Sequence, residues 1–507
     1  MKRFICGICV GVFIGLSGAA AESTLRMGVL GIPVTKGQPY ASMNAPTIYT
    51  WAAIFDSLTF VGHDGAIRPW LALSWENVDP LTWRFDLRPG VTFSNGEPFN
   101  ADAVVNAVDY LISPAAAGDV VASMFNTVVG ARALDALTVE ITTRTPNPVL
   151  PREVSTLRIV APEAWRRLGP QGFGNAPHGT GPFQVERFEP ARVVMRRFDN
   201  SWRPPAFDRL EVRAVPEGPA RVQAMMSRQL DMILGASPDL MDALADNGDQ
   251  VVVVPGSGTF AFSFILNPSH PAFGPANAPL TDVRVRQALN YAVDKNAFLT
   301  ALLGGKTGAA SQPAPPIAFG YDPALAPYPF DPEKARALLA EAGYPDGFAM
   351  VVEIVPGGSI PNGEAIYQKV AEDLAKVGVR VELRPFTIQQ YLRALHFGEF
   401  SGQGFMMDFP SAPTMDVLRA MKLHSCWWKT PYLCVAEDQA LIEEIAQEFD
   451  IERRLNLSRQ LMRRYRDQAY ALYLFNTVEF YGLRRGLTGF EAEGLFIRYD
   501  KIRDSGT

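Results

Sequence analysis

The chain has 507 residues, with 47 lysine or arginine and 53 aspartate or glutamate residues, so its formal net charge is −6. This mild acidity argues against a nucleic-acid-binding protein, which would carry clustered lysine and arginine side chains. The length provides for roughly three domains of ordinary size, and 48% hydrophobic residues are enough to fill more than one core.

The first 21 residues have the composition of a cleaved export signal. Lys2 and Arg3 precede an apolar run over residues 4–16, and the alanines at 19–21 match a cleavage site. The run is too short to cross about 30 Å of hydrocarbon, so a retained membrane anchor is the weaker alternative. We expect cleavage after Ala21, which leaves 507 − 21 = 486 residues in the periplasm.

The mature chain is expected to begin with a strand over residues 25–30, followed by a helical segment over residues 46–58. Trp51 and Phe55 recur at the spacing of one helix face. Core packing is the simpler role for Trp51 and its neighbour Tyr49, and contact with a ligand is the alternative.

Residues 71–112 form the most clearly punctuated unit of the chain. Residues 83–87 alternate large apolar with charged side chains, as a half-buried strand does. An Asn-Gly pair at 95–96 favours a tight turn, and Asn100 is a good N-cap for a following helix. We expect this unit to lie in a compact α+β subdomain over residues 62–177, inserted between two parts of a larger lobe.

A glycine-rich segment with the text Gly-Thr-Gly-Pro-Phe occupies residues 179–183 and leads into two predicted strands, 183–188 and 192–198. The glycines between 172 and 181 do not have the G-x-G-x-x-G spacing of a dinucleotide-binding loop. We therefore expect flexible backbone at a hinge or cleft rim, with Thr180 as a candidate ligand contact.

The central part of the chain predicts a mixed α/β lobe. The apolar runs 251–254 and 260–266 predict two separate strands. Residues 350–354, 364–377 and 379–384 have the order of a βαβ unit, which implies a partly parallel sheet.

Two helices in this part are predicted from their text. Residues 281–295 carry one apolar stripe, as an amphipathic helix does. Residues 331–343 have a capping Asp331, Pro332 at the first helical position and a terminating Gly343.

Two of the four cysteines, Cys426 and Cys434, remain after cleavage of the signal. In an oxidising compartment, a close pair within a Trp- and Pro-containing loop predicts a disulfide, and metal ligation is the alternative. Helices over 437–449 and 451–465 are expected to follow, and then strands near the C-terminus over 470–475 and 477–483.

Four stretches of this text together resemble the family 5 extracellular solute-binding proteins, the peptide/nickel-type binding proteins of ABC importers. They cover residues 74–105 (SWENVDPLTWRFDLRPGVTFSNGEPFNADAVV), 179–202, 281–295 and 331–345. Ala103 departs from the family text, which usually has a second acidic residue there.

The resemblance implies a two-lobed α/β periplasmic-binding-protein fold with mixed sheets, two crossover strands and an extra inserted α+β subdomain. The strands expected to cross are 260–266 and 477–483. The implied parts are the signal peptide over 1–21, lobe I over 22–61, 178–264 and 479–507, the inserted subdomain over 62–177, and lobe II over 265–478.

The resemblance also implies a ligand site near residues 404–418. Asp408 matches the aspartate that pairs with the amino terminus of a bound peptide in relatives, and capping of the following turn is the alternative. Residues 409–411, Phe-Pro-Ser, depart from the usual glycine- and aspartate-rich text, which speaks against a plain dipeptide. The candidate ligand-binding residues are Asp408, Phe405, Met406, Trp427, Trp428, Tyr49, Trp51 and Thr180.

No motif of a hydrolase or metalloenzyme is present, and only five histidines occur. We expect no cofactor and no enzyme activity, but a monomeric substrate-binding protein that delivers a peptide or peptide-like solute to membrane permease subunits. The alternatives are an opine-like compound, an oligosaccharide, a nickel chelate that His396 or His424 contacts, or an exported hydrolase or chaperone on the same scaffold.

Overall fold

The computed structural model describes residues 22–43, 45–356, 360–493 and 496–506. The expected signal peptide at residues 1–21 lies outside them. Within the described residues, we find no helix with the length and apolar character needed to span a bilayer.

One large sheet runs through both lobes. Its strands are β1 (Thr24–Val29), β8 (Phe183–Glu189), β9 (Arg192–Arg197), β10 (Arg209–Ala214), β11 (Met232–Leu234), β12 (Gln250–Phe264), β13 (Phe348–Ile354), β14 (Val379–Pro385), β15 (Gly404–Pro410) and β16 (Ala471–Leu483). Their order is β14-β13-β15-β12-β16-β11-β1-β10-β9-β8. β12 and β16 are antiparallel neighbours and belong to both lobes. The predicted two-lobed fold with two crossover strands is therefore confirmed.

The two crossover strands are longer than expected. β12 joins the predicted strands 251–254 and 260–266, and β16 likewise joins 470–475 and 477–483. Between the two predicted pieces of β12, residues 255–259 carry a register shift and no break in the strand. Gly256 and Gly258 are required by close packing, because an added Cβ would collide with Thr477 and with the carboxylate of Asp408, respectively.

The remaining strands form small sheets. They are the pair β2 (Thr59–Val61) and β3 (Ile67–Pro69), the inserted strands β4 (Ala72–Asp79), β5 (Thr82–Leu87), β6 (Val128–Asp135) and β7 (Thr138–Thr143), and the C-terminal strands β17 (Leu487–Thr488), β18 (Ala492–Glu493), β19 (Phe496–Ile497) and β20 (Arg503–Asp504). β4 to β7 make one antiparallel sheet in the order β4-β5-β7-β6. Near the C-terminus β17 pairs with β20, and β18 with β19.

Helices cover these sheets. They are α1 (Ala45–Ile54), α2 (Ala101–Leu111), α3 (Leu150–Glu153), α4 (Pro162–Asn175), α5 (Gly218–Met226), α6 (Pro238–Asp246), α7 (Ala278–Thr281), α8 (Val283–Ala292), α9 (Lys295–Leu303), α10 (Pro332–Glu341), α11 (Gly363–Ala375), α12 (Ile388–Phe397), α13 (Val417–Met421), α14 (Ala436–Ile445) and α15 (Ile451–Asp467). The predicted N-caps are confirmed, since Asn100 accepts from the Ala103 amide and Asp331 from the Lys334 amide. The predicted helix 281–295 is instead divided between α7, α8 and the start of α9.

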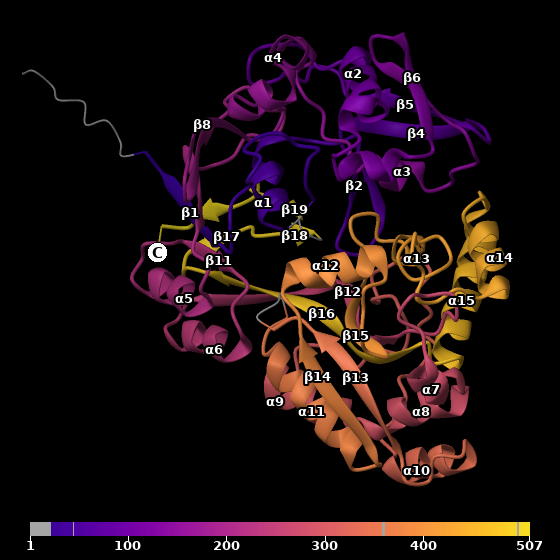
Figure 1. Ribbon diagram of the computed structural model, residues 1–507. Helices are drawn as coiled ribbons and strands as arrows, with labels where there is room; N and C mark the ends of the chain where they lie inside the picture. The colour runs from indigo at the N-terminus through magenta and orange to yellow at the C-terminus, as the bar shows by residue number, and fades with distance from the viewer. Residues whose placement is uncertain (1–21, 44, 357–359, 494–495, 507) are drawn as a thin grey trace, which may run out of the picture.

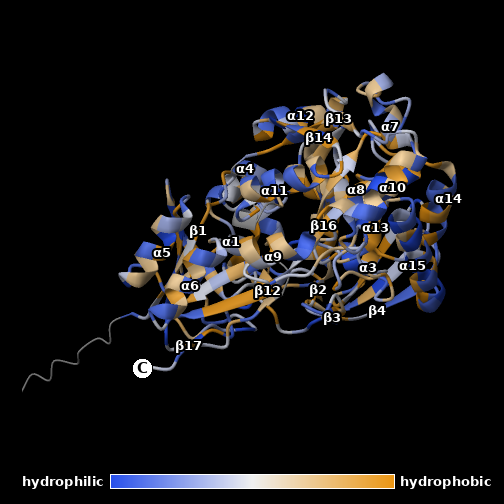
Figure 2. Ribbon diagram, turned by 90° about the horizontal axis from the view of Figure 1, so that it is seen from below, coloured by the Kyte–Doolittle hydropathy of each residue, from blue (hydrophilic) through white to orange (hydrophobic). Residues whose placement is uncertain are grey.

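In Figure 1 the inserted subdomain with β4 to β6 and α2 lies at the top, the helices α9 to α11 lie at the bottom, and β12 and β16 run across the middle. Seen from below and coloured by hydropathy, β12 is largely apolar (Figure 2). Lobe I and the inserted subdomain share one core, which contains Met27 and Phe55 together with Phe85 and Val104. The hydrophobic core of lobe I therefore continues into the inserted subdomain.

The predicted disulfide between Cys426 and Cys434 is confirmed, with the two Cα atoms 4.5 Å apart. Its loop is fixed to the C-terminal end of α12. The Trp428 indole donates to the carbonyl of Leu395 at 2.9 Å, and the Thr430 hydroxyl to that of His396 at 3.0 Å.

Candidate functional site

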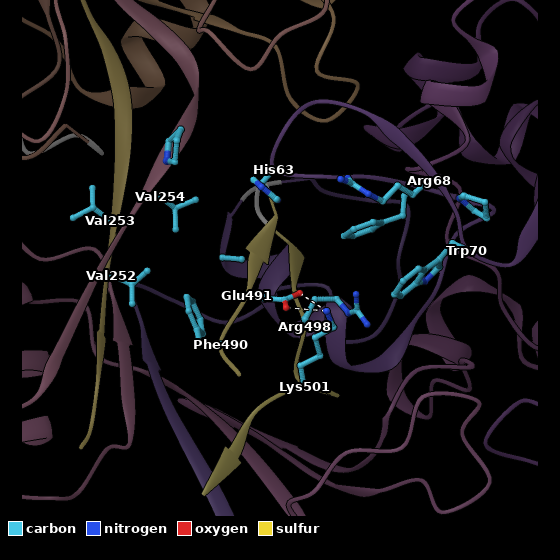
Figure 3. A pocket seen from close by; sticks show the side chains of 14 residues that line it. His63, Arg68, Trp70, Val252, Val253, Val254, Phe490, Glu491, Arg498 and Lys501 are labelled. Carbon is cyan, nitrogen blue, oxygen red and sulfur yellow. Dashed lines mark hydrogen bonds and ion pairs between the residues drawn. The ribbon is translucent and has the colours of Figure 1, made fainter. Parts of the chain in front are cut away.

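A cavity of about 530 Å³ lies beside the crossover strand β12, within the usual size range of small-molecule sites. Figure 3 shows Val252 and Val254 of β12 on one side of it and the β2–β3 segment on the other. The side chains that close it include Phe60, His63, Arg68, Trp70, Phe490, Glu491, Arg498 and Lys501. We call this space the large cavity.

The cations at the rim of the large cavity already have acidic partners. Lys501 pairs with Glu491 at 2.6 Å, Arg498 with Asp500 at 2.7 Å and Arg68 with Asp64 at 2.8 Å. The inner wall is therefore mainly aromatic and aliphatic, with paired charges around it.

A second, smaller cavity of about 60 Å³ lies between the lobes, and we call it the interlobe cavity. Lobe I contributes residues such as Ile48, Ser57 and Arg158, and lobe II contributes the segment 412–415 that follows β15. The rings of Phe60 and Phe496, whose centroids are 5.2 Å apart, line this cavity, and Phe60 also lines the large one. The two cavities are therefore neighbours that share an aromatic wall.

Arg158 is the charged group of the interlobe cavity. Its Nη1 donates to the Ser57 hydroxyl at 3.3 Å. Burial lowers the pKa of its guanidinium to about 10, against the opposing effect of nearby Asp56, so it stays positively charged at neutral pH. A half-buried guanidinium of this kind can bind a carboxylate through two parallel hydrogen bonds.

The lobes also make direct polar contacts beside this cavity. The Arg152 guanidinium of α3 donates to the carbonyls of Thr414 at 3.0 Å and Met415 at 3.4 Å in lobe II, and to that of Gly65 at 2.8 Å in lobe I. Glu153 pairs with Lys422 at 3.3 Å. α3 thus connects lobe I to the segment after β15.

Asp408 lies on β15, opposite Phe260 of β12. Its Oδ1 is buried and has no hydrogen-bond partner among the described residues, and burial raises its pKa to about 7. Asp416, and not Asp408, caps the next helix by accepting from the Leu418 amide. A carboxylate with one buried oxygen that has no partner has the chemistry needed to receive an ammonium group.

The other candidate residues from the sequence are distributed over three places. Phe405 and Met406 neighbour Asp408 on β15, and Phe405 is fully buried against Phe400, with ring centroids 4.2 Å apart. Trp427 and Trp428 lie on the disulfide loop, where only Trp427 is well exposed. In lobe I, Tyr49, Trp51 and Thr180 are buried, and the Thr180 hydroxyl donates to Asp56 at 2.7 Å. The ligand-binding role of these eight residues stays a prediction.

The glycines around Thr180 serve close packing. An added Cβ at Gly179 or Gly181 would collide with the carbonyl end of α1 at Ile54, and the Gly181 amide donates to the Ile54 carbonyl at 3.0 Å. This gives a packing reason for the glycine-rich text, where the sequence suggested hinge flexibility.

Neither histidine considered for nickel lies in a group suited to a metal ion. His424 is fully buried, with its ring stacked on Phe409 at 3.7 Å between centroids and its Nδ1 hydrogen-bonded to the Tyr432 hydroxyl. His396 is exposed on α12. In the part of the chain that the structure describes, no three His, Cys, Asp or Glu side chains could jointly hold a metal.

Two charged residues near the cavities were missed in the sequence, Arg158 and Glu479. Glu479 is the only charged residue of strand β16, and this isolation was the available signal. Arg158 carries no local signal, because its position at a cavity depends on segments distant in sequence.

Asp408 leads to a pH-dependent prediction. Its pKa of about 7 in the folded chain lies above the ordinary 3.8, so the folded state holds an extra proton between these values, and stability is lost as the pH rises through this window. Asp408→Asn removes this dependence. We expect urea unfolding of the ligand-free variant to show a gain of about 2 kcal/mol over wild type at pH 8 and little gain at pH 5. Asp199→Asn, at a carboxylate 76% exposed, should change neither value, and an equal effect of Asp408→Asn at both pH values would contradict the prediction.

Comparison with known proteins supports the resemblance. Residues 66–416 match the family described as bacterial extracellular solute-binding proteins, family 5 Middle. Heme-binding protein A of Haemophilus influenzae is 30% identical over 364 residues, which are 66% of this chain and 65% of that relative. The dipeptide-binding protein of Escherichia coli is 27% identical over 469 residues, 85% of this chain and 84% of the relative.

Solved structures have the same fold. HbpA2 from Haemophilus parasuis has a TM-score of 0.80 at 24% identity and covers 95% of this chain and 99% of its own. NikA from Brucella suis, solved in complex with Fe(III)-EDTA, has a TM-score of 0.80 at 23% identity and the same coverage. Since the family match extends over more than half of the residues, the chain belongs to the family 5 bacterial extracellular solute-binding proteins.

Proposed function

We propose that this protein is the periplasmic solute-binding component of an ABC importer and that it captures a peptide or peptide-like solute between its lobes. The observation that carries the proposal is the interlobe cavity, which shares Phe60 with the large cavity of lobe I and its insertion, within a chain of the family 5 fold. Dipeptide- and glutathione-binding proteins among its relatives support the peptide-like class. The basic and apolar text of residues 1–21 supports export.

Two charged side chains fit such a solute: Arg158, which lines the interlobe cavity, and Asp408 of β15, which precedes the lining segment 412–415. Asp408 offers a carboxylate to an ammonium group and Arg158 a guanidinium to a carboxylate, so a zwitterionic solute would find both complements. Closure around the solute would follow from a higher affinity of the closed form. The monomeric protein would then present the closed form to the permease subunits.

The lobe boundaries predicted from the sequence belong to this proposal. Lobe I would comprise residues 22–61, 178–264 and 479–507 with the insertion 62–177, and lobe II residues 265–478. Separate hydrophobic clusters of the described chain support two lobes, since lobe II has its own clusters on β15 and on α8 and α11, and residues 260–264 of the crossover strand β12 pack into these clusters.

Binding without turnover is the test. The mature chain, residues 22–507, is incubated with tri-alanine and followed by native mass spectrometry and by analysis of the released peptide. We expect one intact peptide per chain, and Asp408→Ala should weaken binding by about 2 kcal/mol or more, which is roughly a 30-fold higher Kd. Glu333→Gln, at a side chain 86% exposed in lobe II, is the control. Cleaved peptide would indicate an enzyme, and no retention would exclude tripeptides without a charged side chain.

A further inference from the structure

Glu479 lies next to the large cavity through the register of the crossover strands. It is opposite Val254, and Tyr481 of the same strand is opposite Val252. Directly opposed residues of an antiparallel pair have their side chains on the same face, with Cβ atoms about 5 Å apart. Val252 and Val254 line the large cavity, and Tyr481 packs against Phe490 of its wall, with ring centroids 4.9 Å apart. The Glu479 side chain therefore lies on the face of the sheet that borders this space. Its residue is only half-buried.

The groups around the Glu479 carboxyl are tyrosines. The Tyr481 hydroxyl donates to its Oε2 at 2.7 Å, and Tyr49 of α1 is a second hydroxyl partner. Burial raises the pKa of the Glu479 carboxyl to about 7. No lysine, arginine or histidine side chain contributes to this shift. The nearest cations of the cavity rim are committed to Glu491, Asp500 and Asp64, as described above.

A purely structural residue at this position would not need a charge. Two tyrosine hydroxyls can be satisfied by an amide as well as by a carboxylate, and even a half-buried carboxylate without a cation loses part of its hydration. A carboxylate held in place by two hydroxyls, next to a cavity with an otherwise apolar inner wall, is instead a complement for a cation that arrives from outside.

We propose that Glu479, held by Tyr481 and Tyr49, is a subsite of the large cavity that binds a protonated amine or a guanidinium of the solute. This inference rests on the proposed function and narrows it. Asp408 would take one cationic group and Glu479 a second one, so the preferred solute is a peptide-like molecule with a basic side chain.

The test compares three tripeptides that differ at one group, Ala-Lys-Ala, Ala-(Nε-acetyl-Lys)-Ala and Ala-norleucine-Ala. Titration calorimetry measures their affinities for wild type, Glu479→Gln and the control Glu333→Gln. Thermal shift with cadaverine, a simple diamine, serves as a probe that needs no peptide backbone.

We expect wild type and Glu333→Gln to prefer the lysine peptide at least tenfold over the other two, and Glu479→Gln to reduce this preference below threefold while it still binds the norleucine peptide. If all three peptides bind wild type equally, or if the preference survives in Glu479→Gln, the inference is overturned and the proposed function stands. If no peptide binds but cadaverine stabilises wild type and not Glu479→Gln, the peptide class is wrong and the subsite stands. If neither probe binds, both are wrong.

Discussion

Replacing Asp56 with alanine is expected to lower the free energy of unfolding by about 3–5 kcal/mol. The Asp56 side chain is fully buried in lobe I and pairs with Arg203, whose Nη2 is 2.8 Å from Oδ1. It also accepts hydrogen bonds from the indoles of Trp70 at 2.7 Å and Trp202 at 3.0 Å, and from the Thr180 hydroxyl at 2.7 Å. Its loss leaves several buried donors without a partner, and each such donor costs about 1–3 kcal/mol.

Urea unfolding followed by tryptophan fluorescence measures this effect, because Trp70 and Trp202 themselves contact Asp56. Asp199→Ala, which removes an exposed carboxylate paired with Arg197, should change stability by less than about 1 kcal/mol. A loss of less than about 1 kcal/mol in Asp56→Ala would show that water or Asp500, the second partner of Arg203, replaces the missing carboxylate.

The contacts of Asp56 also show why the surroundings of Thr180 could not be predicted from the sequence. Its partners come from residues 70, 180, 202 and 203, which are separated from it by up to 147 positions, so no local pattern connects them. Thr180 stays a predicted ligand contact, and its hydrogen bond to Asp56 could not be foreseen from the glycine-rich sequence around it. The local amino-acid sequence predicts a loop, but it does not show which residues the loop packs against.

The features that the sequence did predict are those with a local physical cause. Asn100 and Asp331 cap their helices because the capping hydrogen bond joins residues three positions apart. The βαβ order of residues 350–384 became β13, α11 and β14, with β13 and β14 parallel. Each crossover strand was predicted as two strands. In β12 the residues between the two predicted pieces include Gly256 and Gly258, and these glycines are explained by the proximity of Thr477 and Asp408, which is a long-range contact.

The same distinction holds for the cavities. Asp408 was found because its surrounding text resembles a known family. The sequences around Glu479 and Arg158 show no such resemblance. These two residues are functional candidates because the fold buries part of each side chain beside a cavity. The sequence therefore predicted the fold and Asp408 of the proposed site. It did not predict the other charged residues of that site, Glu479 and Arg158.

Arg152→Ala is expected to weaken solute binding tenfold to a hundredfold by opening the lobes. The Arg152 guanidinium makes two hydrogen bonds to lobe II carbonyls and lies 3.8 Å from the Asp416 carboxylate. Hydrogen bonds from a charged donor contribute about 1.5–3 kcal/mol. If they form only in the closed state, their loss lowers its population, and the apparent affinity falls by the same factor. The fold of lobe II should tolerate the change, because Asp416 keeps its ion pair with Arg454 at 2.6 Å.

Two measurements distinguish opening of the lobes from a local structural change around residue 152. Small-angle scattering of the ligand-free variant should give a larger radius of gyration than wild type, and titration with the solute that wild type retains should give the higher Kd. Arg132→Ala, at a side chain 73% exposed in the same inserted subdomain, should change neither quantity. The prediction is wrong if the radius of gyration is unchanged and the affinity stays within twofold of wild type. Arg152 would then only hold the turn at Gly65 through its hydrogen bond, and closure would depend on contacts with the solute alone.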